Sequence, residues 1–269
     1  MIKPREIQFK AQKAKVRDQQ IEKDYILSWI LQGVAHHEHL IKIIAFKGGT
    51  LLKKVYFKDY RFSEDLDFTL LNDVISNKQI FEWFKEIFEY VKEEANIPLN
   101  IINDNEHKDG SINFYISYIG PLGGQDKKVK IDISKSEKLV FEVITKDVII
   151  SYTDQESHQL LCYPLEEVLV EKLRSVMQRM QPRDFYDIWY LSKIHKMNLD
   201  FYSNEFKIKC ENKQIDPSEF REKLNKRLPE YKKRWGESMM AQIHDLPDFD
   251  QVERELMRNL KKYVFFNDQ

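Results

Sequence analysis

The hydrophobic pattern of the chain changes at Tyr163-Pro164. Before this point, short runs that alternate apolar and polar residues, such as 111–120, are interspersed with amphipathic stretches such as 77–95. After it, apolar residues recur every three or four positions, beginning in 165–180, and this spacing is typical of helices. Strands mixed with helices and then helices alone predict an α+β lobe with a mixed sheet, followed by an all-helical C-terminal lobe.

Individual elements follow from the same patterns. In residues 77–95, apolar positions three or four residues apart form one stripe, which predicts an amphipathic helix. The β-branched run 42–46 ends at a pair of glycines and predicts a buried strand. The other expected strands are 66–71, 99–104, 111–120, 128–134 and a strand pair in 140–152. The other expected helices are 4–35, 50–57, 165–180, 182–194, 201–212, 217–240 and 248–265. The expected domains are 1–160 and 161–269.

Composition indicates where such a protein acts. The net charge is −1 over 269 residues, so contact with nucleic acid requires a local basic patch. Cys162 and Cys210 lie far apart without the spacing of a metal site, as expected in a reducing compartment. No apolar run approaches the roughly 18 residues that span a bilayer, and the N-terminus lacks the apolar stretch of a secretory signal. We therefore expect a cytoplasmic protein with no membrane partner.

Two aspartates separated by one residue lie at the start of an expected strand. Asp67 is in "LDFTLL" (66–71), and Asp65 directly precedes it. Residues i and i+2 of a strand point to one face, so Asp65 and Asp67 are expected side by side, roughly 6–7 Å apart. Like charges this close repel unless a cation lies between them, and Mg²⁺ binds carboxylates together with phosphates. The alternative is an exposed strand whose charges deter aggregation.

A glycine pair lies between the first expected strand and the helix that follows it. Gly48 and Gly49 let backbone N–H groups approach a phosphate, with Thr50 near the start of the helix. Lys47, Lys53 and Lys54 would add positive charge nearby. A tight turn with solvated lysines is the alternative. Together, a phosphate-binding turn and a carboxylate pair would hold a nucleoside triphosphate and its cation.

A third carboxylate lies on another expected strand. In "KVKIDIS", Asp132 shares the polar face with Lys130 and Ser134. An acid on a neighbouring strand could complete a metal site, or accept a proton from an attacking hydroxyl. The alternative is an ordinary solvent-facing aspartate.

A charged cluster spans the first two helices of the C-terminal lobe. Lys172 and Arg179 lie seven residues apart on one helix, and Arg183 and Asp184 open the next, with Asp187 one turn later. The cations could hold phosphates while the acids orient them. A knot of salt bridges between the helices is the alternative.

A basic segment, "REKLNKRLPEYKKRW" at 221–235, carries Tyr231 and Trp235 among its lysines and arginines, and "KAQKAKVR" near the N-terminus is also basic. Basic residues interleaved with aromatic ones are typical of RNA-binding surfaces. A solvated helix face is equally compatible with the pattern. So is a docking surface for a partner protein or a second subunit.

These motifs together resemble the AbiEii/AbiGii nucleotidyltransferase toxins of type IV toxin–antitoxin and phage abortive-infection systems. The similar stretches occur in the family's order over about residues 21–191: "IEKDYIL", "FKGGTLLKKVY", "RFSEDLDF", "KIDIS" and "EKLRSVMQRMQPRDFYDIWYL". The resemblance implies a DNA-polymerase-β-like fold and a role in antiviral defence. It also implies an active enzyme that uses Mg²⁺, or Mn²⁺ in its place, and a cognate antitoxin.

The resemblance also assigns roles to residues. It places Gly48, Gly49 and Thr50 on the glycine motif, and Ser63, Asp65 and Asp67 on the S-x-D-x-D motif. It implies that Asp65, Asp67, Asp132, Lys172 and Asp184 are catalytic and that the first three bind the metal. The expected nucleotide-binding residues are Gly48, Gly49, Thr50, Lys53, Ser63, Arg179 and Arg183.

The expected reaction moves NMP from an NTP to an acceptor hydroxyl, and pyrophosphate leaves. By resemblance the acceptor is the 3′ end of tRNA, or a protein hydroxyl, including one on the toxin itself. A small molecule such as an aminoglycoside is an alternative acceptor, although the basic segment 221–235 favours an anionic one. A degenerate module that only binds a partner is a third possibility. The nucleotide preferred does not follow from the sequence.

Overall fold

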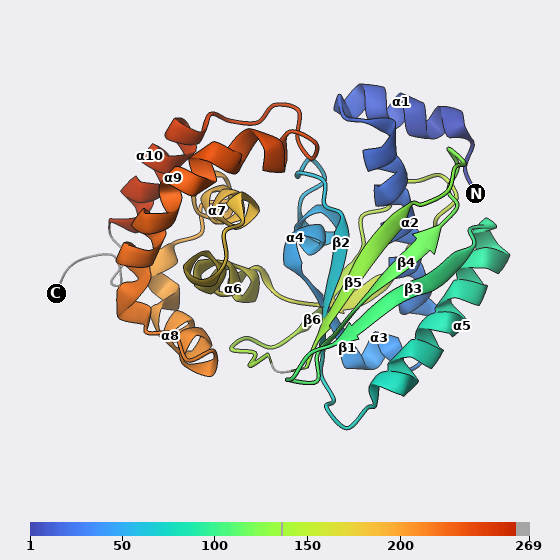
Figure 1. Ribbon diagram of the computed structural model, residues 1–269, viewed down its shortest axis with the longest axis horizontal. Helices are drawn as coiled ribbons and strands as arrows, with labels where there is room; N and C mark the ends of the chain where they lie inside the picture. The colour runs from blue at the N-terminus through green and yellow to red at the C-terminus, as the bar shows by residue number, and fades with distance from the viewer. Residues whose placement is uncertain (136, 262–269) are drawn as a thin grey trace. The chain divides into compact units, whose positions relative to one another are not determined.

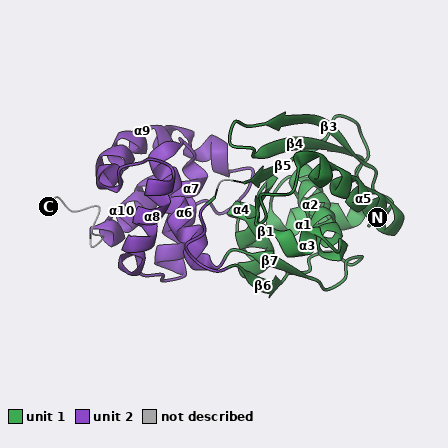
Figure 2. Ribbon diagram, turned by 90° about the horizontal axis from the view of Figure 1, so that it is seen from below, with its two compact units in different colours: residues 1–137, 143–163 green, residues 138–142, 164–269 purple. Residues whose placement is uncertain are grey.

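A computed structural model describes residues 1–135 and 137–261 of the chain. These residues form two compact units, which are coloured separately in Figure 2. Unit 1 comprises Met1–Glu137 and Val143–Tyr163, and unit 2 comprises Lys138–Glu142 and the chain from Pro164 onward. The short segment 138–142 therefore belongs by its contacts to the helical unit, although it lies between two strands of the other.

Unit 1 is built on one seven-stranded mixed sheet (Figure 1), with strand order β3-β4-β5-β2-β1-β7-β6. The strands are β1 (Ile44–Lys47), β2 (Asp65–Leu70), β3 (Leu99–Glu106), β4 (Ile112–Tyr118), β5 (Lys128–Ser134), β6 (Ile144–Asp147) and β7 (Gln159–Cys162). Strand β2 lies between β5, to which it is parallel, and β1, to which it is antiparallel. The residues of β2 therefore have neighbours on both sides.

Helices cover one face of this sheet. Helix α5 (Asn77–Ala95) begins where the Ser76 side chain accepts a hydrogen bond from the Gln79 amide. Its apolar stripe packs on the sheet, with the Phe84 ring 5.0 Å from the Phe114 ring of β4. The other helices of the unit are α1 (Pro4–Ala14), α2 (Asp18–His36), α3 (Leu40–Ile43), α4 (Gly48–Leu51) and a π-helical turn, Leu52–Tyr56.

The opposite face of the sheet is polar. Buried and half-buried residues alternate strictly along β4 and β5. In β2 the buried Leu66 and Phe68 alternate with the half-buried Asp65 and Asp67. Because side chains of a strand alternate between faces, the acids lie on the side away from the apolar core, as predicted.

Unit 2 is helical. It contains α6 (Leu165–Gln178), α7 (Pro182–Trp189), a π-helical turn (Tyr190–Ile194), 3-10 turns at Leu199–Tyr202 and Pro217–Glu219, α8 (Ser203–Asn212), α9 (Phe220–Met239) and α10 (Phe249–Leu260). Its core is aromatic: the Phe185 ring lies 5.6 Å from Tyr231 and 5.7 Å from Phe249. Within the part of the chain that the structure describes, no helix is long and apolar enough to cross a bilayer.

Several sequence-based boundaries were wrong. The helix expected over 4–35 is two helices, because Lys15 adopts a left-handed conformation with φ of 54°. The expected strand at 42–46 begins only at Ile44, after a short helix. The pair expected in 140–152 contains one strand, β6, whose partner β7 was not predicted. The end of the helix expected at 248–265 lies partly outside the described residues.

Candidate active site

A row of polar residues crosses the polar face of the sheet. In the strand register, Asn113 of β4 is opposite Asp132 of β5, Asp132 is opposite Asp67 of β2, and Asp67 is opposite Lys47 of β1. Directly opposed residues share a face, so these four side chains form one row, which we call the acidic row. Asp65 lies in the next row, opposite Lys130. The sheet thus brings Asp65, Asp67 and Asp132 onto adjacent strands.

The glycine pair is packed against this row. Gly48 has φ of +79°, and a Cβ atom on it would lie 2.2 Å from Oδ2 of Asp67. A Cβ atom on Gly49 would lie 2.6 Å from Nη2 of Arg61, a side chain only 2% exposed. The Thr50 hydroxyl donates to the backbone carbonyl of Asp65. These contacts fasten the turn to β2, so only glycine fits where the backbone meets the Asp67 carboxylate.

The lysines after the turn have different surroundings. Lys54 is buried, forms a 2.6 Å ion pair with Asp24 of α2, and donates to Oγ of Ser28. Burial lowers the pKa of Lys54, and the Asp24 carboxylate opposes this shift. Lys54 therefore holds the π-helical turn to α2, and the expectation that it adds charge for a phosphate is wrong.

Lys53 and Ser63, both expected to bind nucleotide, contact other parts of the chain. The Lys53 ammonium donates to the carbonyl of Lys58 at 2.7 Å and lies 4.4 Å from the centre of the Phe62 ring. Ser63 is buried, and its backbone carbonyl accepts from Nε2 of Gln20 at 3.3 Å. Of the three lysines near the turn, Lys47 is the one in the acidic row; it is buried, with its ammonium 5.7 Å from the Tyr163 ring.

A lysine lies among the acids. The Lys130 ammonium is 2.7 Å from Oδ1 of Asp132. Burial alone would lower the pKa of Lys130, but the hydrogen bond to Asp132 and the charges of Asp132 and Asp65 raise it above its usual value. The Asp132 and Asp65 carboxylates therefore favour the charged form of Lys130.

The donor atoms here are of the kind that Mg²⁺ binds. Asp65, Asp67 and Asp132 supply hard carboxylate oxygens, and the missing Cβ of Gly48 leaves the space that the Asp67 carboxylate occupies. Across residues 1–135 and 137–261, however, no three acidic, histidine or cysteine side chains converge closely enough to hold a metal. The three acids thus match Mg²⁺ in the type of their donor atoms and lie on one face of the sheet, and the third acid, Asp132, is paired with Lys130.

The charged cluster of unit 2 is a salt-bridge network. Lys172 of α6 lies 2.7 Å from Asp184 and 2.9 Å from Asp187, both on α7 and buried. Arg179, with a side chain 57% exposed, makes two hydrogen bonds to Asp184. Burial alone would raise the pKa of Asp184, but Lys172 and Arg179 lower it below its usual value. Arg183 is half-buried and has no ion pair within the described residues.

The basic segment 221–235 lies on helix α9, and one interpretation of it was wrong. Tyr231 is fully buried and donates to the carbonyl of Arg179 at 3.1 Å. Trp235 is 5% exposed and donates to the carbonyl of Pro247. Because both rings are in the core of unit 2, they cannot stack on bases. The exposed basic residues of this helix are Arg221, Lys226, Lys232 and Lys233, of which Lys232 pairs with Asp250.

Sequence reasoning missed two residues near the acidic row and the glycine turn. Asn113 completes the acidic row, and the alternation of "SINFYISYIG" already assigned it to the polar side of β4. Arg61 packs over Gly49, yet no spacing rule connects it with the turn. The place of Asn113 could therefore have been predicted from the strand alternation, whereas the place of Arg61 is set by how its loop folds.

The comparisons with known proteins agree with this fold. The family model described as "Nucleotidyl transferase AbiEii toxin, Type IV TA system" matches residues 29–255. No curated protein matches the sequence.

Two solved structures have a similar fold. JHP933 of Helicobacter pylori is 18% identical, with a TM-score of 0.59 and 93% of each chain covered. MenT4, a nucleotidyltransferase toxin of Mycobacterium tuberculosis H37Rv, is 16% identical, with a TM-score of 0.58, 100% of this chain and 91% of that chain covered. At this level of identity the similarity establishes the shared fold.

Proposed function

Because the chain belongs to the AbiEii family of nucleotidyl transferase toxins from type IV toxin–antitoxin systems, we propose that it transfers NMP from an NTP to the 3′ end of a tRNA. Such a transfer would block translation and stop growth in the cytoplasm until a cognate antitoxin acts. The observation that carries this proposal is the acidic row, in which Asp67 lies between Lys47 and Asp132 and against Gly48.

Residues of the acidic row and their neighbours have distinct parts in the proposed reaction. Asp65 and Asp67 would hold Mg²⁺, which supplies positive charge for the triphosphate when it is bound. Lys47 and the backbone amides of Gly48 and Gly49 bind the departing pyrophosphate. Asp132 accepts the proton of the attacking hydroxyl, and Lys130 orients its carboxylate through the 2.7 Å contact.

Each bond that forms in the proposed reaction is matched by one that breaks. The acceptor oxygen loses its proton to Asp132 and forms a bond to the α-phosphorus, and the bond from that phosphorus to pyrophosphate breaks. Thr50 holds the glycine turn through its hydrogen bond to β2. We also propose that Lys172 and Asp184 are required for transfer, because by resemblance Lys172 and the Arg183-Asp184 pair fall on the family's two C-terminal motifs. Arg183 and the neighbouring Arg179 would supply charge for the nucleotide.

The test is to incubate the protein with each labelled NTP, Mg²⁺, total RNA and cell protein, and then to identify the labelled molecule. Labelled tRNA that loses its label after trimming at the 3′ end supports the proposal. Labelled protein or toxin would support a protein acceptor instead, and a labelled aminoglycoside in a parallel reaction would support a small-molecule acceptor. No transfer with any NTP or acceptor contradicts the enzymatic proposal as a whole.

A further inference from the structure

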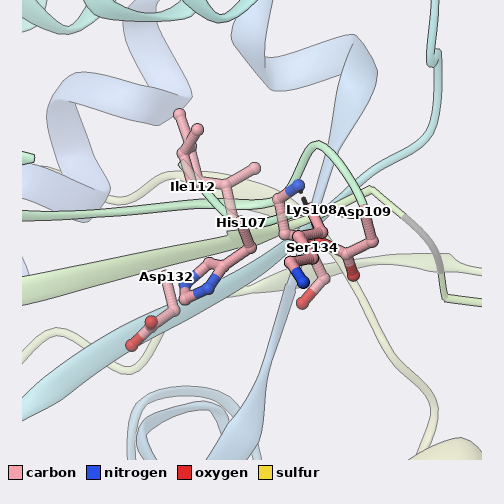
Figure 3. A pocket seen from close by; sticks show the side chains of 8 residues that line it. His107, Lys108, Asp109, Ile112, Asp132 and Ser134 are labelled. Atoms are coloured by element: carbon pink, nitrogen blue, oxygen red, sulfur yellow. Dashed lines mark hydrogen bonds between the residues drawn. The ribbon is translucent and has the colours of Figure 1, made fainter. Parts of the chain in front are cut away.

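A cavity of about 520 Å³ opens beside the acidic row. It lies between the turn that joins β3 to β4 and the end of β5, entirely within unit 1. Its polar lining residues are His107, Lys108, Asp109, Ser111, Asp132 and Ser134 (Figure 3). The volume is in the range of small-molecule sites and is sufficient for a nucleoside.

The cavity and the glycine turn lie on opposite sides of Asp67. Asp132 belongs both to the row and to the cavity wall. Along the sheet the order is β4, β5, β2, β1, so the cavity lies on the β5 side of Asp67 and the glycine turn on the β1 side. If the triphosphate lies by Gly48, the acceptor must approach from the other side for the hydroxyl to reach the α-phosphorus opposite the leaving group.

The lining chemistry suits a sugar and a base. The carboxylates of Asp109 and Asp132 can accept hydrogen bonds from hydroxyls, and Lys108 adds donors to the same lining. His107 is exposed, and Nε2 of its ring is 2.6 Å from Nδ2 of Asn113, the next member of the row. This contact fixes one edge of an imidazole, a ring on which a base can stack. In Figure 3, His107 and Asp132 lie toward the same end of the cavity.

We propose that this cavity binds the terminal nucleoside of the acceptor, with the base on the His107 ring and a ribose hydroxyl directed to Asp132. The inference rests on the proposed function and adds to it the place where the acceptor end is held. The hydroxyl gives its proton to Asp132, its oxygen bonds to the α-phosphorus, and pyrophosphate leaves. His107 is a binding residue that takes no part in the bond changes.

The first experiment measures KM for a short RNA acceptor and KM for the NTP in the full chain. His107→Ala is expected to raise the RNA KM about tenfold, since stacking of one base is lost, and to leave the NTP KM unchanged. His107→Phe keeps a ring and should recover most of the loss. His244→Ala removes an exposed histidine of unit 2 and should change neither constant. An unchanged RNA KM in His107→Ala, or equal rises in both constants, would overturn the proposal.

The second experiment needs no catalysis. Adenosine, which has a base and a ribose but no phosphate, is titrated into histidine-labelled protein while the NMR signals of His107, assigned with His107→Ala, are followed. A saturable shift with adenosine and none with pyrophosphate is expected. No shift with adenosine, or an equal shift with pyrophosphate, overturns the cavity assignment. If adenosine binds but no transfer occurs with any NTP, the proposed function and the acceptor role are contradicted. The assignment of the cavity as a nucleoside-binding site is then still supported.

Discussion

Gly48 occupies space that no other residue can share with Asp67. Its φ of +79° is a conformation that L side chains rarely adopt, and an added Cβ would meet the carboxylate at 2.2 Å. The same turn places Lys47 opposite Asp67 in the strand register. The position of the carboxylate therefore depends on the absence of a side chain one residue after the strand.

Gly48→Ala should displace Asp67 and abolish transfer. Ala at a positive φ costs about 1–2 kcal/mol in stability, and the clash adds to this cost. Gly123→Ala is the matched control, because Gly123 has φ of +64° and nothing within 4 Å of an added Cβ. Urea unfolding should show a loss of stability in both variants, larger in Gly48→Ala, and only Gly48→Ala should lose activity. Full transfer by Gly48→Ala would show that the packing of Asp67 on the turn is unimportant.

Helices and strands that carry a cap or a regular hydrophobic period in their own sequence were predicted correctly. Helix α5 and strand β5 have the predicted bounds, because Ser76 caps a long amphipathic stretch and "KVKIDIS" alternates strictly. Strand β7 is four residues long, too short for periodicity to indicate, and it forms by pairing with β1 and β6. Its existence depends on residues distant in sequence, as does the burial of Tyr231 and Trp235.

The same distinction applies to the candidate site. The period of a strand predicted that Asp65 and Asp67 share a face, and the alternation of β5 predicted the side of Asp132. The strand register that sets Asp132 opposite Asp67, and the Lys130 ion pair, could not be predicted, because pairing between β2 and β5 joins segments over sixty residues apart. The contact of Lys54 with Asp24 was missed for the same reason.

Helices α6 and α7 are joined by one buried cation. Lys172→Met should destabilise unit 2 by about 3–5 kcal/mol, because it leaves Asp184 and Asp187 buried without that partner. Lys232→Met removes a pair with Asp250 that is more than half exposed, and should change stability by less than about 1 kcal/mol. Urea unfolding followed by tryptophan fluorescence, to which Trp189 and Trp235 of unit 2 contribute, compares the two. Similar losses in both variants would contradict the energetic role of the buried network.

The same network predicts the response to acid. The pKa of Asp184 is lower in the folded protein than in the unfolded chain, where it is about 3.9. Its contribution is therefore fully present well above pH 4 and is lost as the pH falls through the folded value. The free energy of unfolding of the wild type should fall more steeply below about pH 5 than that of Asp184→Asn. Equal slopes in the two proteins would contradict the lowered pKa.

At the scale of the whole molecule, the two units contain different parts of the family's motifs. Unit 1 contains the glycine turn and the three acids, and unit 2 contains Lys172 and Asp184. The acids lie on the face of the sheet opposite the apolar core, which packs between the sheet and helix α5. Substitutions in the acidic row should therefore change catalysis with little effect on stability, whereas those in the Lys172 network should change both.

The transfer rate of Asp132→Asn at saturating NTP and RNA tests the central claim most directly. A fall of about 10²–10⁴-fold is expected, because the proton acceptor is lost. Mg²⁺-dependent NTP binding should be retained, because Asp65 and Asp67 remain to hold the metal, and the unfolding midpoint should be unchanged. Asp104→Asn, an exposed acid on β3 outside the acidic row, should keep the wild-type rate. A wild-type rate in Asp132→Asn, under conditions where the wild type transfers nucleotide, would contradict the assignment of the acidic row as the catalytic centre.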